Sequence, residues 1–292
     1  MQHRPIKTAV FPVAGQGTRF LPATKAVPKE MLPVVDKPLL QYAVDEALAA
    51  GIERLVFITA RGKGAIDDHF DMASELVAGL KARGKTAELA SLEGTCLEPG
   101  RITSIRQQEP AGLGHAVWCA RHIVGADAFA VLLPDELLWN PARPALAAMH
   151  DAYRQMGGNI ISVLEVTEAH THRYGIVTPG RSDGLLTEVR GMVEKPQVGT
   201  APSRLAAIGR YILQPEVMDV LAKGRRGAGG EIQLTDAMAE LIGVQPFHAL
   251  TFEGTRFDCG DKVGHLMANV ALALERSDTG PALRDWLRSL EL

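Results

Sequence analysis

Four short apolar runs, separated by stretches with helical spacing, are the feature that most limits how this chain can fold. The runs lie at residues 8–14, 54–59, 101–105 and 128–133, and each is typical of a buried strand. Between them, apolar side chains recur at helical spacing over 39–48, before Gly51, and over 72–83, before Gly84. Strand, helix and strand in succession predict parallel neighbours in a sheet covered by helices, with ligands at the carboxyl ends of the strands.

The second half of the chain has a different rhythm. Strand-like runs with short Gly, Pro and Asp turns between them lie at 159–166, 174–178, 185–193 and 205–213. Helical patterns return at 215–222, 235–242 and 262–276. Because the sequence has no internal repeat and no linker-like segment, we expect one mixed α/β body with a β-rich second half.

Composition excludes several classes of partner. The 31 Lys and Arg against 34 Asp and Glu give a net charge of -3, which offers no general attraction to a nucleic acid polymer or an anionic membrane. The three cysteines, Cys96, Cys119 and Cys259, lack any Cys-x-x-Cys spacing, so we expect neither disulfides nor a zinc knuckle. No secretory signal pattern precedes the first strand, and no apolar run approaches the ~20 residues of a membrane helix. We therefore expect a cytoplasmic protein that binds no membrane.

A glycine loop, Gly15-Gln-Gly-Thr-Arg19-Phe-Leu-Pro22, follows the first strand. Glycines let backbone amides approach phosphate oxygens closely, although a pair of glycines fits a plain tight turn equally well. A dinucleotide fingerprint would require a third glycine where Phe20 stands, and a P-loop would require Gly-Lys-Ser/Thr from that same position. The loop therefore belongs to neither class.

Basic residues follow the loop, on a segment that three prolines are expected to keep extended. The cations are Arg19, Lys25 and Lys29, and the prolines are Pro22, Pro28 and Pro33. This arm predicts a polyphosphate site beside the loop. A solvated basic surface loop is the alternative, because exposed Lys and Arg are the usual case.

The whole segment from Gly15 to Pro33 resembles the opening signature of the bacterial UTP-glucose-1-phosphate uridylyltransferases, a family of sugar nucleotidyltransferases. The resemblance continues through segments 36–42, 112–116, 194–196, 229–236 and 257–261, and so covers nearly the whole chain. It implies the nucleotide-diphospho-sugar transferase fold, an α/β, Rossmann-like, mostly parallel mixed sheet covered by helices, with a β-rich sugar-binding half. Residues 1–292 would form a single nucleotidyltransferase domain, with a nucleotide-binding half at about 1–156, a sugar-phosphate-binding half at 157–260 and a C-terminal helical segment at 261–292.

The resemblance also implies an activity. UTP and α-D-glucose 1-phosphate would give UDP-glucose and pyrophosphate by Mg²⁺-dependent, in-line nucleotidyl transfer, in a homodimer or homotetramer. The alternatives are a thymidylyl- or adenylyltransferase acting on a sugar 1-phosphate, and a regulatory paralogue without catalysis. The attacking phosphate is already anionic near neutral pH, because a phosphate monoester has a second pKa of about 6. This chemistry needs no general base, and the sequence offers no Ser-His-Asp or Cys-His arrangement.

The predicted nucleotide site combines the glycine loop, its arm and a second glycine loop near His115. By resemblance, Arg19 and Lys29 hold the triphosphate, while Gln107 and Gly112 receive the pyrimidine base. The residues predicted to bind the nucleotide are Ala14, Gly15, Gly17, Thr18, Arg19, Lys29, Gln107 and Gly112.

Two aspartates are the predicted metal ligands. Asp135 follows the apolar run 128–133, so it should emerge at a carboxyl end of the sheet, where a carboxylate can hold a hard cation. A plain turn is the alternative reading, but by resemblance Asp135 binds Mg²⁺. Asp258 is the second ligand by resemblance, although Asp261 lies near it and either aspartate could cap the helix that follows.

The sugar phosphate is assigned to residues far along the chain. Glu194 and Lys195 end a strand-like run, and by resemblance they bind the sugar and its phosphate. The alternative is an ordinary turn without a binding role. Gly175 would let backbone amides approach the sugar. The predicted catalytic residues are Arg19, Lys29, Asp135 and Lys195. His170 and His172 have metal-ligand spacing on a predicted strand, but without a third ligand we expect a surface feature.

Overall fold

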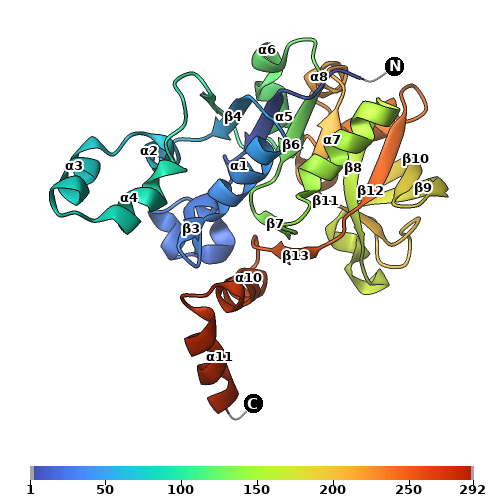
Figure 1. Cartoon of the computed structure of the whole chain (residues 1–292). Helices are drawn as coiled ribbons and strands as arrows, with labels where there is room; N and C mark the ends of the chain where they lie inside the picture. Colours follow the sequence, from blue (N-terminus) through green and yellow to red (C-terminus); the bar gives the residue numbers. More distant parts are fainter. Residues whose placement is uncertain (1–2, 291–292) are drawn as a thin grey trace.

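A mixed sheet of nine strands forms the centre of the molecule, which this computed structural model describes from residue 3 to residue 290 (Figure 1). The strand order is β5-β4-β1-β6-β11-β8-β12-β10-β9. Four neighbours are parallel, as the sequence predicts: β5 (Ile102–Arg106), β4 (Arg54–Thr59), β1 (Thr8–Pro12) and β6 (Phe129–Leu132). The carboxyl ends of these strands therefore meet at one edge, where ligands bind in such sheets.

Strands from the second half of the chain continue the same sheet. The long strand β11 (Leu205–Leu213) runs antiparallel to β6, with Tyr211 opposite Val131. Beyond it lie β8 (Asn159–Glu165), β12 (Phe247–Thr251), β10 (Leu186–Glu194) and β9 (Gly175–Asp183). The α/β fold class and the β-rich second half are confirmed.

Helices cover both faces of the sheet because strand side chains alternate between the faces. Val10 faces a core completed by α5 (Leu113–Cys119), α6 (Arg121–Val124), α8 (Val217–Ala222) and α9 (Leu234–Leu241). Its neighbour Phe11 faces the opposite core, with α1 (Leu39–Ala49) and α7 (Ala145–Met156). Arg210 and Glu46 form a buried ion pair of 2.8 Å between β11 and α1, and Glu46 also accepts the Leu146 amide of α7. The pair thus fixes both helices to the sheet.

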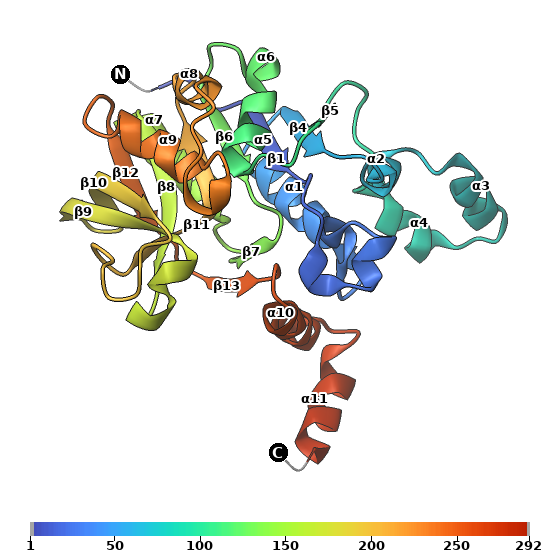
Figure 2. The ribbon, with the colours of Figure 1, turned by 180° about the vertical axis from the view of Figure 1, so that it is seen from behind.

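Smaller elements surround this body. One lobe contains α2 (Gly64–Phe70), α3 (Ser74–Ala82) and α4 (Thr86–Glu93), and a small hairpin contains β2 (Pro33–Val34) and β3 (Lys37–Pro38). A two-stranded sheet pairs β7 (Glu136–Trp139) with β13 (Thr255–Asp258). Helix α10 (Lys262–Glu275) packs against this part of the body through Ala268 and Leu272, and α11 (Gly280–Ser289) then projects away from it, as both views show (Figures 1 and 2). No helix within residues 3–290 is long and apolar enough to span a membrane.

The arm after the glycine loop is coiled, so the prediction of an extended segment is wrong. It forms three short 3₁₀ turns, η1 (Thr18–Phe20), η2 (Ala23–Lys25) and η3 (Lys29–Met31). Pro22 and Pro28 directly precede two of these turns, where a fixed φ and a missing N–H are compatible with helical structure. The Thr24 hydroxyl donates to the Gly17 carbonyl at 2.7 Å and closes the arm back onto the loop.

Candidate active site

An open cavity of about 530 Å³ lies at the carboxyl ends of the parallel strands. Most residues predicted to bind the nucleotide line it, together with one predicted metal ligand: Ala14, Gly15, Gly17, Thr18, Lys29, Gln107, Gly112 and Asp135. Arg19 is not part of this wall. Its guanidinium donates to the Gly260 carbonyl at 3.3 Å, beside the second predicted metal ligand.

Lys29 and Asp135 form an ion pair at the floor of the cavity, and each keeps about a quarter of its side chain exposed. Burial works against the charge on Lys29, but the carboxylates of Asp135 and Glu30 outweigh it and raise the pKa of this ammonium. Burial likewise opposes the charge on Asp135, and Lys29 nevertheless lowers the pKa of this carboxyl. The two groups therefore keep each other ionised next to the space where a triphosphate would lie.

A second, buried ion pair lies next to Lys29, whose charge its carboxylate helps to stabilise. Glu30 accepts a hydrogen bond from Lys63 at 2.7 Å, and the two side chains are only 1% and 9% exposed. Within residues 3–290, the other carboxylate oxygen of Glu30 has no hydrogen-bond partner. Sequence reasoning missed this pair because Lys63 precedes α2, far along the chain, and no local pattern connects it to the arm.

The two predicted metal ligands face one small space. Asp135 precedes β7 and Asp258 ends β13, and these strands pair with Glu136 opposite Asp258. A side-chain carbon placed on Gly260 would lie 3.1 Å from Asp135 Oδ2 and 3.2 Å from Asp258 Oδ1. The missing side chain thus leaves a cradle between two carboxylates, which fits Mg²⁺ because this ion usually keeps several waters and takes one or two protein carboxylates.

Asp261 has a different place. Its side chain accepts the Val263 amide at 2.9 Å and caps the first turn of α10. Of the two aspartates that the sequence left open, Asp258 is the one whose carboxylate lies beside that of Asp135 at Gly260, while Asp261 caps the helix.

Three further residues surround Asp258 and were missed from sequence. Arg173 donates to Asp258 Oδ2 at 3.1 Å. Arg256 forms two hydrogen bonds with Glu136, at 2.6 and 2.7 Å, and its guanidinium lies 4.9 Å from the centre of the Tyr174 ring. Glu136 and Arg256 each adjoin a predicted ligand in sequence, but only the register of β7 and β13 brings them together.

The predicted sugar-phosphate residues also come together. Glu194 ends β10 and lies opposite Gly175 of β9. A side-chain carbon on Gly175 would lie 2.9 Å from Thr235 Oγ1 and 3.3 Å from Glu194 Oε2, so the glycine lets Thr235 and Glu194 both approach this end of β9 closely. Lys195 Nζ lies 3.3 Å from Glu194 Oε1, and the Lys195 amide donates to the Tyr174 carbonyl at 3.0 Å. The Tyr174 hydroxyl accepts a hydrogen bond from Arg256, so the residues predicted to bind the sugar phosphate are connected to the carboxylate cradle.

Comparison with known proteins identifies the family. Residues 9–274 match the nucleotidyl transferase family. The chain belongs to this family. Within it, the chain is 49% identical to the UTP-glucose-1-phosphate uridylyltransferase of Komagataeibacter xylinus over 97% of both chains, and 48% identical to that of Bacillus subtilis over 97% of this chain and 94% of the relative.

Solved structures agree. A UTP-bound UGPase from Acinetobacter baumannii has a TM-score of 0.90 and 41% identity, covering 98% of this chain and all of the other. A UDP-glucose pyrophosphorylase complexed with UDP-glucose has a TM-score of 0.83 and 37% identity, covering 93% of this chain and all of the other. The resemblance predicted from the motifs is confirmed.

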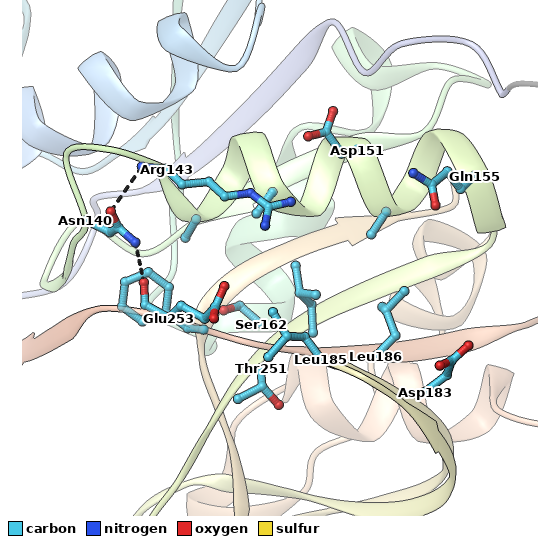
Figure 3. Close-up of a pocket in the computed structure, with 15 residues that line it drawn as sticks. Asn140, Arg143, Asp151, Gln155, Ser162, Asp183, Leu185, Leu186, Thr251 and Glu253 are labelled. Atoms are coloured by element: carbon cyan, nitrogen blue, oxygen red, sulfur yellow. Dashed lines mark hydrogen bonds between the residues drawn. The ribbon is translucent and has the colours of Figure 1, made fainter.

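Two other features lie outside this nucleotidyl transferase site. His170 and His172 lie in the 3₁₀ helix η4 (Glu168–Arg173) rather than on a strand, because the segment turns back on itself with the Thr171 hydroxyl donating to the Glu168 carbonyl. A second cavity, of about 230 Å³, opens between α7 and strands β8, β10 and β12. Figure 3 shows Arg143, just before α7, and Gln155 of α7 on one side of it and Leu185 and Leu186 on the other. None of the predicted site residues lines this cavity.

Proposed function

We propose that this chain transfers the uridylyl group of UTP to α-D-glucose 1-phosphate and releases UDP-glucose and pyrophosphate. The observation that carries the proposal is the carboxylate cradle of Asp135 and Asp258 beside Gly260. The ion pair of Lys29 with Asp135 joins the open cavity of about 530 Å³ to this cradle. Glu194 and Lys195 are connected to the cradle through Tyr174 and Arg256. The names of the curated relatives support the same reaction.

The reaction exchanges one phosphorus–oxygen bond for another. A phosphate oxygen of glucose 1-phosphate forms a bond to the α-phosphorus of UTP, and the bond to the β-phosphate bridging oxygen breaks in line with it, so pyrophosphate leaves. Because the nucleophile is already anionic, with a second pKa of about 6, the protein has only to position the reactants and balance charge.

The residues divide this work by position. Arg19, Lys29 and the amides of the glycine loop bind the triphosphate, while Glu194 accepts sugar hydroxyls and Lys195 orients the sugar phosphate. Asp135 and Asp258 would hold Mg²⁺. When bound, the ion supplies positive charge at the α-phosphate as the bond to pyrophosphate breaks.

One assay separates this proposal from its alternatives. Pyrophosphate release from UTP, dTTP and ATP is measured with glucose 1-phosphate and Mg²⁺, and we expect UTP to react fastest and EDTA to abolish the rate. A preference for dTTP or ATP would instead indicate a thymidylyl- or adenylyltransferase. No release from any triphosphate would indicate a regulatory paralogue.

We also propose a cytoplasmic homo-oligomer, a dimer or a tetramer, assembled through the C-terminal helices α10 and α11. One face of α10 exposes apolar side chains at helical spacing: Val263, Leu266, Met267 and Val270, which are 39% to 63% exposed. Trp286 of α11 adds a side chain that is 57% exposed. Apolar surface of this kind favours contact with a second copy, because an isologous interface buries the same stripe on both chains. The free thiols of Cys96, Cys119 and Cys259 are compatible with a reducing cytoplasm.

Placing charge on this stripe should separate the subunits. The wild-type protein is expected to have the mass of two or four 31.4 kDa chains, and the double variant Leu266→Asp/Met267→Asp a lower one, by light scattering after size-exclusion chromatography. Val244→Asp is the control, because Val244 is 79% exposed but lies outside α10 and α11. A monomeric wild-type protein, or an unchanged mass in the double variant, would contradict this assembly.

A further inference from the structure

The side-chain amide of Gln107 is held in one orientation by two acceptors. Gln107 directly follows β5 and is 9% exposed, and its amide nitrogen donates to the Gly112 carbonyl at 3.1 Å and to Nδ1 of His115 at 3.0 Å. A carbonyl oxygen can only accept, so the nitrogen of Gln107 and not its oxygen faces Gly112. Both amide hydrogens are then used, and His115 accepts through Nδ1 with its proton on Nε2.

The remaining polar atom of Gln107 is an acceptor. Gln107 lines the nucleotide cavity, and its carbonyl oxygen has no hydrogen-bond partner among residues 3–290. Uracil carries a hydrogen on N3 and can donate to such an oxygen, whereas N3 of cytosine carries a lone pair and would face it acceptor to acceptor. An amide fixed in this way therefore favours a uracil base and rejects cytosine.

His115 itself stays outside the cavity wall, so it acts on the base only through Gln107. The His115 ring stacks on Trp118, with ring centroids 5.8 Å apart. The guanidinium of Arg121 lies over the Trp118 ring, 3.6 Å from its centre. The imidazole is thus held by α5 and α6, independently of the nucleotide.

The other acceptor is equally fixed. Gly112 has a φ of 110°, which L side chains rarely adopt, and a side-chain carbon there would lie 2.7 Å from Glu231. The amides of Ile232 and Gly114 bind the carbonyls of Ala111 and Ile232, each at 2.8 Å, and dock the loop on the segment before α9. The Gly112 carbonyl cannot follow a moving glutamine side chain.

We propose that His115 is a positioning residue that sets nucleobase choice by holding the Gln107 amide with its oxygen toward the base. The inference rests on the proposed function, in which this cavity receives UTP. Without the His115 acceptor, one amide hydrogen loses its partner, and only the Gly112 carbonyl still holds the nitrogen. The amide then turns more readily and can present an N–H to N3 of cytosine. Selectivity would fall although no group in contact with the base has been replaced.

The test compares UTP with CTP in the wild-type protein and in His115→Ala, by kcat/KM at saturating glucose 1-phosphate and by calorimetric binding of each nucleotide alone. We expect the UTP to CTP ratio to fall at least about tenfold in His115→Ala, since a buried donor loses its partner. KM for UTP should rise, while kcat and KM for glucose 1-phosphate change little. His115→Asn restores an acceptor near the position of Nδ1 and should restore the ratio.

Controls separate the possible failures. His122→Ala removes an exposed histidine of α6 and should leave the ratio unchanged. An unchanged ratio in a folded His115→Ala variant, or equal binding of UTP and CTP by the wild-type protein, would overturn the proposal. If the wild-type protein releases no pyrophosphate, the proposed function fails, but the calorimetric comparison still decides whether His115 sets base preference.

Discussion

An Asp135→Asn variant should fold normally and lose roughly 1,000-fold or more in kcat, because charge stabilisation at a transferred phosphoryl group is among the largest single contributions to catalysis. The substitution keeps the shape of the side chain but removes one of the two carboxylates that face the cradle at Gly260. It also removes the partner of Lys29, whose ammonium would then lack its nearest counter-charge at the floor of the cavity. The substitution therefore changes the charge around the triphosphate in two places, at the cradle and at Lys29.

Three measurements check this prediction. Pyrophosphate release gives kcat, calorimetry with Mg²⁺ in the presence of UTP gives metal affinity, and circular dichroism with thermal unfolding reports the fold. Asp151→Asn is the matched control, because Asp151 lies on α7 beside the second cavity and should have no effect (Figure 3). Wild-type turnover or wild-type metal affinity in the Asp135 variant would remove this residue from the site.

A Lys195→Ala variant should raise KM for glucose 1-phosphate by about 100-fold, the scale expected when a charge-assisted contact to phosphate is lost. KM for UTP should stay within about twofold of the wild-type value, since Lys195 lies on the sugar side and is no part of the nucleotide cavity wall. Lys195 is half exposed and has a φ of 46°, an uncommon conformation for a residue with a side chain. The hydrogen bond from the Lys195 amide to the Tyr174 carbonyl holds this backbone, so the side chain that carries the ammonium extends from a fixed position.

Steady-state kinetics with each substrate varied in turn distinguish the two KM values. Lys7→Ala serves as the control, because Lys7 precedes β1 at the opposite edge of the sheet and pairs with exposed Glu53. An unchanged KM for glucose 1-phosphate would exclude Lys195 from phosphate binding, and a parallel rise in KM for UTP would indicate a general disturbance of the fold instead.

Local sequence patterns predict the regular elements of this fold well. The runs 54–59 and 205–213 coincide with β4 and β11, because continuous apolar stretches bounded by turn residues have few other ways to bury their side chains. The arm from Arg19 to Pro33 was misread because proline fixes its own φ but is compatible with both extended chain and short turns. The contact from Thr24 to Gly17 that selects the turns depends on the folded loop.

The candidate site, too, could be predicted from the sequence only in part. Motif resemblance places Lys29, Asp135 and Glu194, and the structure brings each next to its expected neighbours, while their roles stay predictions. Three ion pairs around the site could not be predicted: Lys63 with Glu30, Arg256 with Glu136 and Arg173 with Asp258. Each pair joins segments far apart in sequence, and such a pairing is fixed only by sheet register and packing.

In the short β7–β13 ladder, the distance between the carboxylates of Asp135 and Asp258 depends on the number of residues in each strand. Glu136 pairs with Asp258, and the Cys259 amide binds the Asp135 carbonyl at 2.8 Å, so Asp135 and Asp258 are placed by backbone hydrogen bonds. A one-residue slip in a strand moves every side chain to the other face. During divergence, the exposed positions of this ladder can therefore exchange side chains freely, whereas an insertion or deletion of a single residue in either strand would separate the two carboxylates and would be eliminated.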